Sequence, residues 1–328
     1  MSVTRISDPV IDVHLTPGHA ARALRSDARA GLLADPKWLP PKWFYDARGS
    51  ELFEEITRLP EYYPTRAERE ILDRRAGEIA ARTGAHTLVE LGSGSSEKTR
   101  LLLDALRGHG TLREFVPLDV SESALRDAAE AIVDDYPGLS VHGVVGDFTE
   151  HLGRLPGESP RVVAFLGGTI GNLLPDERAK FFGALHDVLG RGEWLLLGTD
   201  LVKDPGVLVP AYDDSAGVTA EFNKNVLRVL NRQLGADFDL DSFEHVALWD
   251  SRNEWIEMRL RATREMSVLL PEIGLEVEFA KGEELRTEIS AKFRREGIES
   301  ELAAAGFGLS SWWTDSGNRF ALSLSRVE

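Results

Sequence analysis

The sequence predicts an α/β protein built on a mainly parallel sheet, and three features of its pattern lead to that prediction. Short apolar runs recur between residues 86 and 200, stretches with helical periodicity separate most of them, and a glycine-rich turn follows the first. The runs are Thr87–Leu91, Phe115–Leu118, Val141–Val145, Val162–Leu166 and Trp194–Gly198. Buried strands that alternate with helices form parallel sheets with right-handed crossovers. We therefore expect a Rossmann-like domain.

Two of the intervening helices have recognisable starts. Ser121 is a favourable N-cap for a helix that carries Leu125 and Ile132 on one face, seven positions apart. Asp176 is expected to open a further helix that runs to Leu189. Both helices lie between predicted strands, as a parallel sheet requires.

The segment before residue 86 has a different residue pattern. We expect a helix from Thr16 to Leu33, because a threonine followed by a proline is a typical helix start. Leu39–Tyr45 and Leu59–Pro64 combine prolines with aromatic residues and predict ordered loops. A long helix is expected from about Thr65.

The segment after Asp200 predicts a helix followed by antiparallel strands. Val218, Phe222, Val226 and Val229 form one stripe of a helix that runs to about Leu234, and polar and apolar residues then alternate. The expected strands are Glu257–Ala262 and Leu275–Phe279. A helix to Ala305 and a strand at Arg319–Ser325 are expected to return to the first sheet.

These changes in residue pattern along the chain predict two domains. Residues 66–201 and 292–328 form the parallel domain in this interpretation. The N-terminal segment, residues 1–65, and the insertion at 202–291 form a second, α+β domain that binds the substrate.

Composition restricts the classes of function. The 328 residues carry a net charge of −16 and no cysteine, so thiolate metal sites are excluded and nucleic acid is an unfavourable partner. The histidines show no metal-ligand spacing, and no metal is expected. No apolar run reaches the roughly 20 residues of a membrane span, and Met1–Arg5 does not resemble a signal peptide. We expect a cytoplasmic monomer that does not bind membranes.

The glycine turn has two competing interpretations. Residues from Gly92 to Thr99 match a phosphate-binding P-loop except at Glu97, where a carboxylate replaces the second glycine. A dinucleotide-binding turn also requires glycine at that position. S-adenosylmethionine (AdoMet) contains no phosphate and carries a sulfonium cation, so a carboxylate at this position does not exclude it. AdoMet binding is the favoured interpretation.

Acidic residues at the next two strand ends support AdoMet. Asp119 ends the second strand, where a carboxylate can accept hydrogen bonds from both ribose hydroxyls. Asp147 and Phe148 follow the third strand and offer a carboxylate for the adenine amino group and a ring for the base. Open α/β sheets bind ligands at the carboxyl ends of their strands.

Asn172 follows the fourth predicted strand, at the edge expected to face the methyl acceptor. Its side chain both donates and accepts, so it can hold an amine or a carboxylate. An asparagine after Gly171 is also a common turn residue, so its residue type alone leaves both interpretations open.

Nine segments carry a resemblance that covers almost the whole chain. They are Pro40–Asp46, Leu59–Pro64, Leu91–Thr99, Phe165–Leu173, Leu197–Asp204, Ala211–Asp214, Gly217–Asn223, Ala236–Leu240 and Thr287–Ser290. Together they resemble the histidine-specific Nα-methyltransferases of ergothioneine biosynthesis, of the actinobacterial type. The resemblance implies a class I methyltransferase domain, AdoMet as methyl donor, and transfer of three methyl groups to the α-amine of free L-histidine, which gives hercynine.

The resemblance also implies a histidine pocket between the two domains. Asn172 and Tyr212 match the residues that hold the substrate carboxylate. Glu288 and Ser290 match the residues that bind the imidazole, with Tyr62 beside them. Two residues apart in an extended segment, Glu288 and Ser290 point to one side.

The remaining expected site residues surround the amine and AdoMet. The Gly167 carbonyl and the Tyr45 hydroxyl match neighbours of the amine, so Tyr45, Gly167 and Asn172 are the expected catalytic residues. Met258 is a further predicted substrate-binding residue. The residues that match the AdoMet positions of the family are Gly92, Lys98, Asp119, Asp147 and Phe148. Gly168 and Ala291 depart from the serine and cysteine of the family.

The sequence leaves three alternative functions open. A methyltransferase of the same fold for another amino acid or small amine would share the glycine loop and differ at Glu288 and Ser290. A P-loop ATPase would have to tolerate Glu97 against phosphate. A non-catalytic sensor would bind AdoMet or histidine without turnover.

Overall fold

The computed structural model describes residues 8–15, 17–94 and 96–328, and these form two compact units. Unit 1 contains residues 8–15, Pro64–Val202 and Lys292–Glu328. Unit 2 contains residues 17–63 and Lys203–Ala291. The expected N-cap Thr16 and residue Ser95 of the glycine loop lie outside the described residues, as does the N-terminal segment Met1–Arg5.

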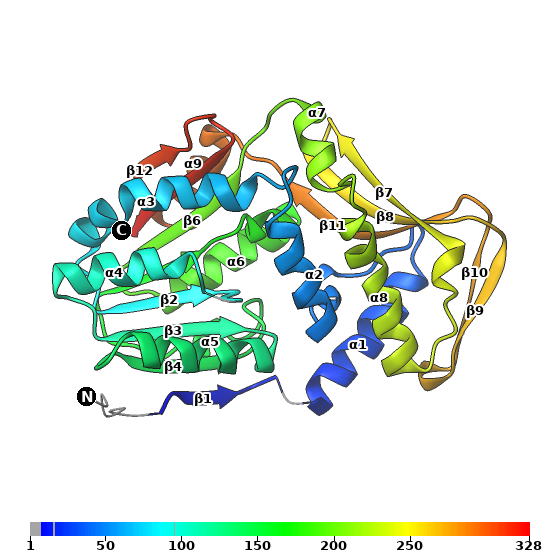
Figure 1. Ribbon diagram of the computed structural model, residues 1–328, viewed down its shortest axis with the longest axis horizontal. Coiled ribbons are helices and arrows are strands. Elements are labelled where there is room, and N and C mark those ends of the chain that lie inside the picture. The colour runs from blue at the N-terminus through cyan, green and yellow to red at the C-terminus, as the bar shows by residue number, and fades with distance from the viewer. Residues whose placement is uncertain (1–7, 16, 95) are drawn as a thin grey trace. The chain divides into compact units, whose positions relative to one another are not determined.

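Unit 1 is built on an eight-stranded sheet in the order β1-β4-β3-β2-β5-β6-β13-β12 (Figure 1). Its strands are β1 (Val10–Val13), β2 (Thr87–Leu91), β3 (Glu114–Asp119), β4 (Ser140–Val145), β5 (Arg161–Phe165), β6 (Trp194–Asp200), β12 (Phe307–Thr314) and β13 (Phe320–Val327). The first six pair in parallel, and β13 is antiparallel to both β6 and β12. The predicted mainly parallel sheet is confirmed.

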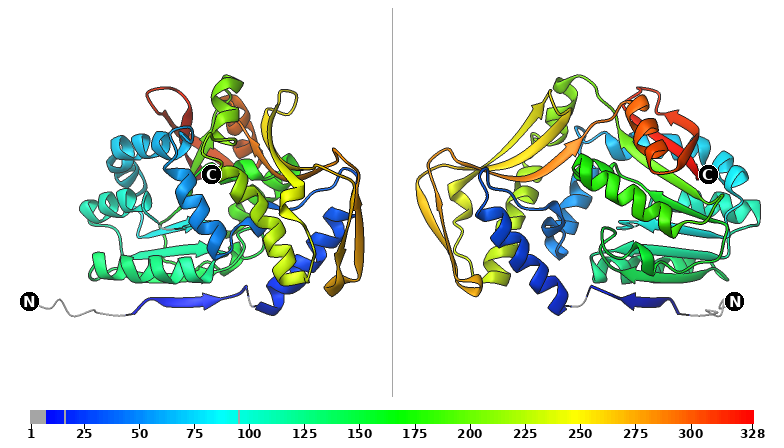
Figure 2. Two further views of the ribbon diagram at one scale, coloured as in Figure 1. Left: turned by 45° about the vertical axis from the view of Figure 1, so that its right-hand side comes forward. Right: turned by 180° about the vertical axis from the view of Figure 1, so that it is seen from behind.

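Helices cover both faces of this sheet. They are α3 (Pro64–Thr83), α4 (Thr99–His109), α5 (Glu122–Asp135), α6 (Pro175–Val188) and α9 (Arg295–Ala304), with 3-10 turns η2 (Leu152–Arg154) and η3 (Thr169–Asn172). Helices α3, α4 and α5 lie on the face presented in Figure 1, whereas α6 and α9 lie on the face seen from behind in Figure 2. Fully buried Phe115, Phe165, Phe182 and Phe320 belong to the core of this unit.

Two expectations for unit 1 need correction. Helix α6 begins at Pro175, with Leu174 as N-cap, because proline suits the first helical position and the Glu177 carboxylate accepts from the Leu174 N–H at 2.8 Å. Asp176 lies within the first turn instead. Residues 1–65 were expected to join the second domain, yet β1 pairs in parallel with β4. This long-range pairing has no local signature in a four-residue strand.

Unit 2 combines helices with antiparallel strands. Its helices are α1 (Pro17–Leu32), η1 (Pro41–Phe44), α2 (Ala47–Thr57), α7 (Pro205–Leu208), η4 (Val209–Ala211), α8 (Val218–Leu234), η5 (Leu240–Ser242) and η6 (Pro271–Ile273). Its strands are β7 (Phe243–Asp250), β8 (Trp255–Ala262), β9 (Met266–Leu270), β10 (Leu275–Phe279) and β11 (Glu284–Ala291). The strands form a sheet β11-β8-β7 and a hairpin β9-β10, and α8 packs against β7 and β8.

Helix α2 was not expected from the sequence. Asp46 caps it by accepting from the Gly49 N–H at 2.8 Å, and Asn225 of α8 donates to Asp46 and to the Phe44 carbonyl. A Cβ on Gly49 would lie 1.7 Å from the Phe44 oxygen, so only glycine allows this close approach. The predicted loop at Leu39–Tyr45 therefore contains a 3-10 turn that leads directly into a helix.

No helix within the described ranges 8–15, 17–94 and 96–328 combines the length and apolar character needed to cross a membrane.

Candidate functional site

The glycine loop connects β2 to α4 at the carboxyl end of the parallel sheet. Gly92 and Gly94 have φ values of 69° and 49°, in the left-handed region that favours glycine. A Cβ placed on either residue would meet no described atom within 4 Å. The loop therefore leaves its open side accessible for the close approach of a ligand.

Asp119 is held beside this loop by main-chain hydrogen bonds. The Gly94 N–H donates to Oδ2 and the Ser121 N–H donates to Oδ1, each at 2.9 Å. Burial raises the pKa of the Asp119 carboxyl, and these two hydrogen bonds counteract part of that effect. Each carboxylate oxygen has a further lone pair, so the group retains the capacity to accept from a ribose diol.

Asp147 and Phe148 stand just after β4, as expected. The buried Asp147 carboxylate accepts from the Thr149 N–H at 2.8 Å and from the Thr149 hydroxyl at 2.6 Å. The half-buried Phe148 ring packs edge-on against Phe165, with centroids 4.9 Å apart. The structure thus brings the predicted adenine contacts to the same sheet edge as Gly92 and Asp119.

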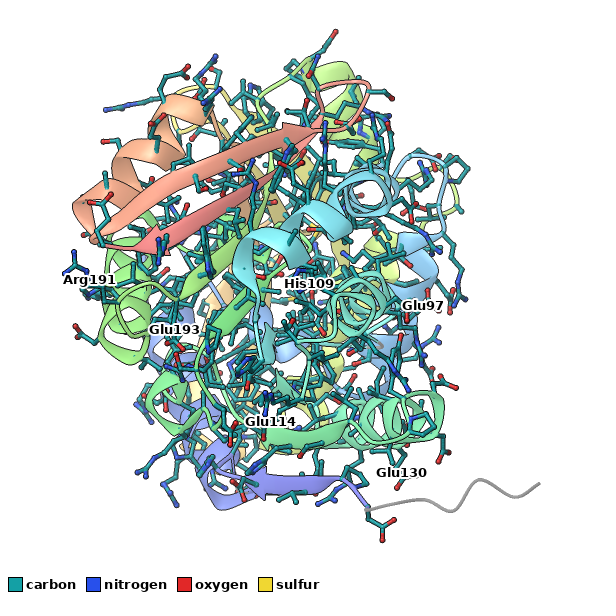
Figure 3. All side chains as sticks on the ribbon, turned by 90° about the vertical axis from the view of Figure 1, so that its left-hand side faces the viewer. Glu97, His109, Glu114, Glu130, Arg191 and Glu193 are labelled. Carbon is teal, nitrogen blue, oxygen red and sulfur yellow. The ribbon has the colours of Figure 1, made fainter. Side chains whose placement is uncertain are left out.

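Lys98 is placed differently from a P-loop lysine. Its ammonium forms an ion pair with the fully buried Glu68 carboxylate of α3. The neighbouring Glu97 is exposed and lies at the periphery of the molecule in Figure 3. A lysine engaged by a carboxylate is poorly placed to neutralise a polyphosphate, which disfavours the P-loop interpretation. Among the described residues, no group of three histidine or acidic side chains is arranged to hold a metal ion.

Glu68 itself was missed by the sequence analysis. Both of its carboxylate oxygens accept from the Gly167 N–H, at 2.8 and 3.0 Å, so it links the Lys98 ammonium to the turn after β5. A Cβ on Gly198 would lie 2.2 Å from its Oε1, so a glycine in β6 makes room for it. No sequence signal distinguishes Glu68 from the other glutamates of its helix.

Glu90 is a second buried carboxyl near the glycine loop. It accepts a hydrogen bond from the Ser96 hydroxyl at 3.1 Å and another from the Thr99 hydroxyl. Burial raises the pKa of Glu90 to about 8, against the lowering effect of these hydroxyls and of Lys98. The carboxyl is therefore largely protonated at neutral pH.

Gly167 and Asn172 belong to one compact turn after β5. Gly167 and Gly168 have φ values of 78° and 73°, and η3 ends at the half-buried Asn172. The serine that the family resemblance implies at position 168 would have to adopt a left-handed backbone here, which glycine does without strain. The predicted neighbour of the amine, Gly167, and the predicted carboxylate ligand of unit 1, Asn172, are thus five residues apart on one turn.

Three predicted tyrosines of unit 2 form one aromatic cluster with Phe53. The Tyr45 and Tyr62 rings contact Phe53 edge-on, with centroid distances of 5.7 and 6.2 Å. The Tyr62 ring also contacts the Tyr212 ring at 6.4 Å. Loops that are far apart in the sequence, before α2, before α3 and after β6, therefore bring their tyrosines together.

Met258, Glu288 and Ser290 lie on one face of the three-stranded sheet. Glu288 stands opposite Met258 and Ser290 stands opposite Ile256, and residues directly opposite one another on paired strands share a face. The Ser290 hydroxyl is hydrogen-bonded to the Tyr212 hydroxyl at 2.7 Å. Four of the predicted substrate-binding residues, including Tyr212, are thus brought together within unit 2.

Comparison with known proteins identifies the family. A sequence model described as histidine-specific, SAM-dependent methyltransferase matches residues 24–327. The chain is 60% identical over 312 residues to the histidine N-alpha-methyltransferase of Mycolicibacterium smegmatis, covering 95% of this chain and 97% of that protein. With the same coverage, it is 56% identical to the histidine N-alpha-methyltransferase of Mycobacterium tuberculosis. Ergothioneine biosynthesis protein 1 of Neurospora crassa is 32% identical over 298 residues, 88% of this chain and 33% of that protein. The chain belongs to the family of histidine-specific, S-adenosylmethionine-dependent methyltransferases.

Proposed function

We propose that this protein transfers methyl groups from AdoMet to the α-amino nitrogen of free L-histidine, three times, giving hercynine for ergothioneine biosynthesis. The observation that carries the proposal is 60% identity to a histidine N-alpha-methyltransferase over 95% of the chain. The grouping of Met258, Glu288 and Ser290 on one sheet face, with Tyr212 bonded to Ser290, supports it.

On the donor side, AdoMet supplies an electrophilic methyl group on a sulfonium. Gly92 and Gly94 allow close approach of its amino-acid part, and Asp119 accepts from the ribose hydroxyls. Asp147 and Phe148 contact adenine in this assignment. Lys98, whose ammonium is paired with the Glu68 carboxylate, is a further residue assigned to the AdoMet site.

On the acceptor side, Glu288 and Ser290 bind the two ring nitrogens of the imidazole, with Tyr62 beside them. Asn172 and Tyr212 hold the substrate carboxylate. The Gly167 carbonyl and the Tyr45 hydroxyl adjoin the amine. These assignments rest on family resemblance, and the hydrogen bond between the Tyr212 and Ser290 hydroxyls supports the assignments of these two residues.

The chemistry requires a neutral amine, because an ammonium has no lone pair with which to attack the methyl carbon. Holding that lone pair about 3 Å from the carbon supplies most of the rate enhancement. The amine loses one proton for each methyl group it gains. After the third transfer the nitrogen is quaternary and has no proton to donate, so its hydrogen bonds to the pocket are lost and the reaction stops.

The test is incubation of the purified protein with AdoMet and L-histidine, followed by mass spectrometry of the products. We expect mono-, di- and trimethylated histidine to appear in that order, with trimethylhistidine as the end product. Histamine, which lacks the carboxylate, and phenylalanine, which lacks the ring nitrogens, serve as control substrates.

Three results would contradict the proposal. Methylation of another amino acid in preference to histidine would indicate the alternative substrate class. Binding of AdoMet and histidine without product would indicate a sensor. Tight binding of Mg-ATP with none of AdoMet would overturn the ligand assignment itself.

A further inference from the structure

A chain of buried and partly buried hydrogen bonds joins Tyr212 to the strand that carries Glu288 and Ser290. The Thr287 hydroxyl donates to Asn223 Oδ1 at 2.6 Å, and Asn223 Nδ2 lies 2.8 Å from His245 Nδ1. His245 Nε2 lies 2.8 Å from the Tyr212 carbonyl oxygen. The Tyr212 hydroxyl is in turn hydrogen-bonded to the Ser290 hydroxyl, on the same strand as Thr287. The chain of hydrogen bonds therefore closes into a ring, which we call the Thr287 ring.

From Thr287 through Asn223 and His245 to the Tyr212 carbonyl, the Thr287 ring has only one consistent direction of hydrogen bonding. Asn223 Nδ2 also donates to the Arg259 carbonyl at 3.0 Å, and Asn223 Oδ1 accepts from Thr287, so the amide orientation is fixed. His245 Nδ1 must then accept, and Nε2 must carry the proton that is donated to Tyr212. Burial lowers the pKa of His245 and favours this neutral imidazole, although Asp213 lies 3.9 Å from Nε2.

Thr287 also stands where the pairing of β11 with β8 is irregular. Arg286 stands opposite Arg259 and Glu288 opposite Met258, so Thr287 is the additional residue of a β-bulge. Without the bulge, Glu288 would stand opposite Glu257 and face the other side of the sheet. The Thr287 hydroxyl lies 3.0 Å from the Met258 carbonyl and 2.6 Å from Asn223, so it is anchored at the irregularity.

We propose that Thr287, Asn223 and His245 are positioning residues that hold the imidazole-binding residues of β11 and the carboxylate-binding Tyr212 in one fixed arrangement. The inference rests on the proposed function, because it takes Glu288, Ser290 and Tyr212 as substrate contacts. Thr287 and Asn223 are 1% and 0% exposed, so they act through the residues that they hold.

The test compares Thr287→Val, which keeps the shape and removes the hydroxyl, with Thr287→Ser, which keeps the hydroxyl. We expect Thr287→Val to raise the KM for L-histidine about tenfold, as loss of a buried hydrogen bond does, and to leave the AdoMet Kd unchanged. Thr287→Ser should restore the KM. Thr263→Val is the matched control, because the Thr263 hydroxyl donates to the Ser242 carbonyl in the same unit and lies outside the ring.

Imidazole NMR of ¹⁵N-labelled protein supplies a second readout that needs no variant to fold stably. We expect His245 in the wild-type protein to show a protonated Nε2 and an unprotonated Nδ1, and Thr287→Val to disturb this signature. If Thr287→Val does not fold, His245→Gln and His245→Leu replace it. The glutamine can both accept from Asn223 and donate to Tyr212, whereas the leucine can do neither.

The outcomes separate the two proposals. A wild-type protein that does not methylate histidine would overturn the proposed function. A wild-type protein that does so, while Thr287→Val matches Thr263→Val in KM or Thr287→Ser fails to restore it, would overturn the positioning role. The positioning role would also be overturned if His245 of the wild-type protein were protonated on Nδ1. Equal KM values for histidine in His245→Gln and His245→Leu would overturn it as well.

Discussion

Glu90 keeps its proton in the folded protein at pH values where the unfolded chain has released it. Burial is the main cause, because removing the Glu90 carboxyl from water raises its pKa from 4.5 to about 8. Folding therefore binds a proton in this pH window. The contribution of Glu90 to the free energy of unfolding falls as pH rises from about 4.5 to about 8, by about 1.4 kcal/mol per pH unit.

Glu90→Gln is expected to remove this part of the pH dependence. The amide oxygen still accepts from Ser96 and Thr99, but the side chain cannot ionise. Urea unfolding without ligand, at several pH values across this range, measures the effect. The wild-type stability should decline more steeply with pH than that of Glu90→Gln, so that the variant gains most at the alkaline end. Equal slopes would show that Glu90 is not protonated in the native state.

Helix α3 and strand β6 meet at Gly198, where the absence of a side chain leaves room for a buried carboxylate. Glu68 projects from the helix onto Gly198, and a Cβ there would lie 2.2 Å from its Oε1. Gly198→Ala should therefore displace the Glu68 carboxylate from the Gly167 N–H and from Lys98. We expect a loss of about 1–3 kcal/mol in the free energy of unfolding, the cost of leaving buried polar groups unpaired. AdoMet binding should weaken because Lys98 loses its anchor.

Gly77→Ala provides the matched control for this prediction. Gly77 lies in the same helix as Glu68, and a Cβ there would meet no described atom within 4 Å. Alanine in a helix interior should stabilise the protein by roughly 0.5–1 kcal/mol. Chemical unfolding and calorimetric titration with AdoMet measure both variants. If Gly198→Ala matches Gly77→Ala in unfolding free energy and AdoMet affinity, the close contact between β6 and Glu68 contributes to neither.

For the molecule as a whole, the proposed AdoMet contacts belong to unit 1, whereas the imidazole contacts belong to unit 2. Substitutions in the two units should therefore have separable effects on the two ligands. Asp119→Ala should weaken AdoMet binding by about 1.5–3 kcal/mol through the lost charge-assisted hydrogen bonds. Glu288→Ala should leave AdoMet binding unchanged, cut activity on histidine and relax the rejection of phenylalanine. The reason is that polar groups in a binding site discriminate against a substrate that cannot pair with them by about 10⁴-fold or more.

Calorimetry with AdoMet, combined with steady-state kinetics on histidine and phenylalanine, measures this separation. Asp119→Asn is a useful companion, because it retains one acceptor for the Gly94 and Ser121 N–H groups. Loss of AdoMet binding in Glu288→Ala, or full histidine selectivity in that variant, would contradict the assignment of β11.

Local sequence determined much of unit 1. The apolar runs that became β2 to β6 are continuous because buried parallel strands have two covered faces, and this pattern is visible without tertiary contacts. The N-cap at Ser121 and the α8 stripe from Val218 are equally local. The positions of Gly92, Asp119 and Asp147 at successive strand ends followed from strand order alone.

Only the tertiary structure decided the features that depend on distant partners. Strand β1 pairs with β4, about 130 positions away, and Glu68 reaches Gly167 across 99 positions, with no local pattern to mark either. The β-bulge at Thr287 sets the face on which Glu288 lies, because a shift of one residue reverses the side-chain alternation of a strand. The sequence alone determined which residues are candidates for the chemistry. Long-range pairing, which no short segment encodes, decided which of them meet.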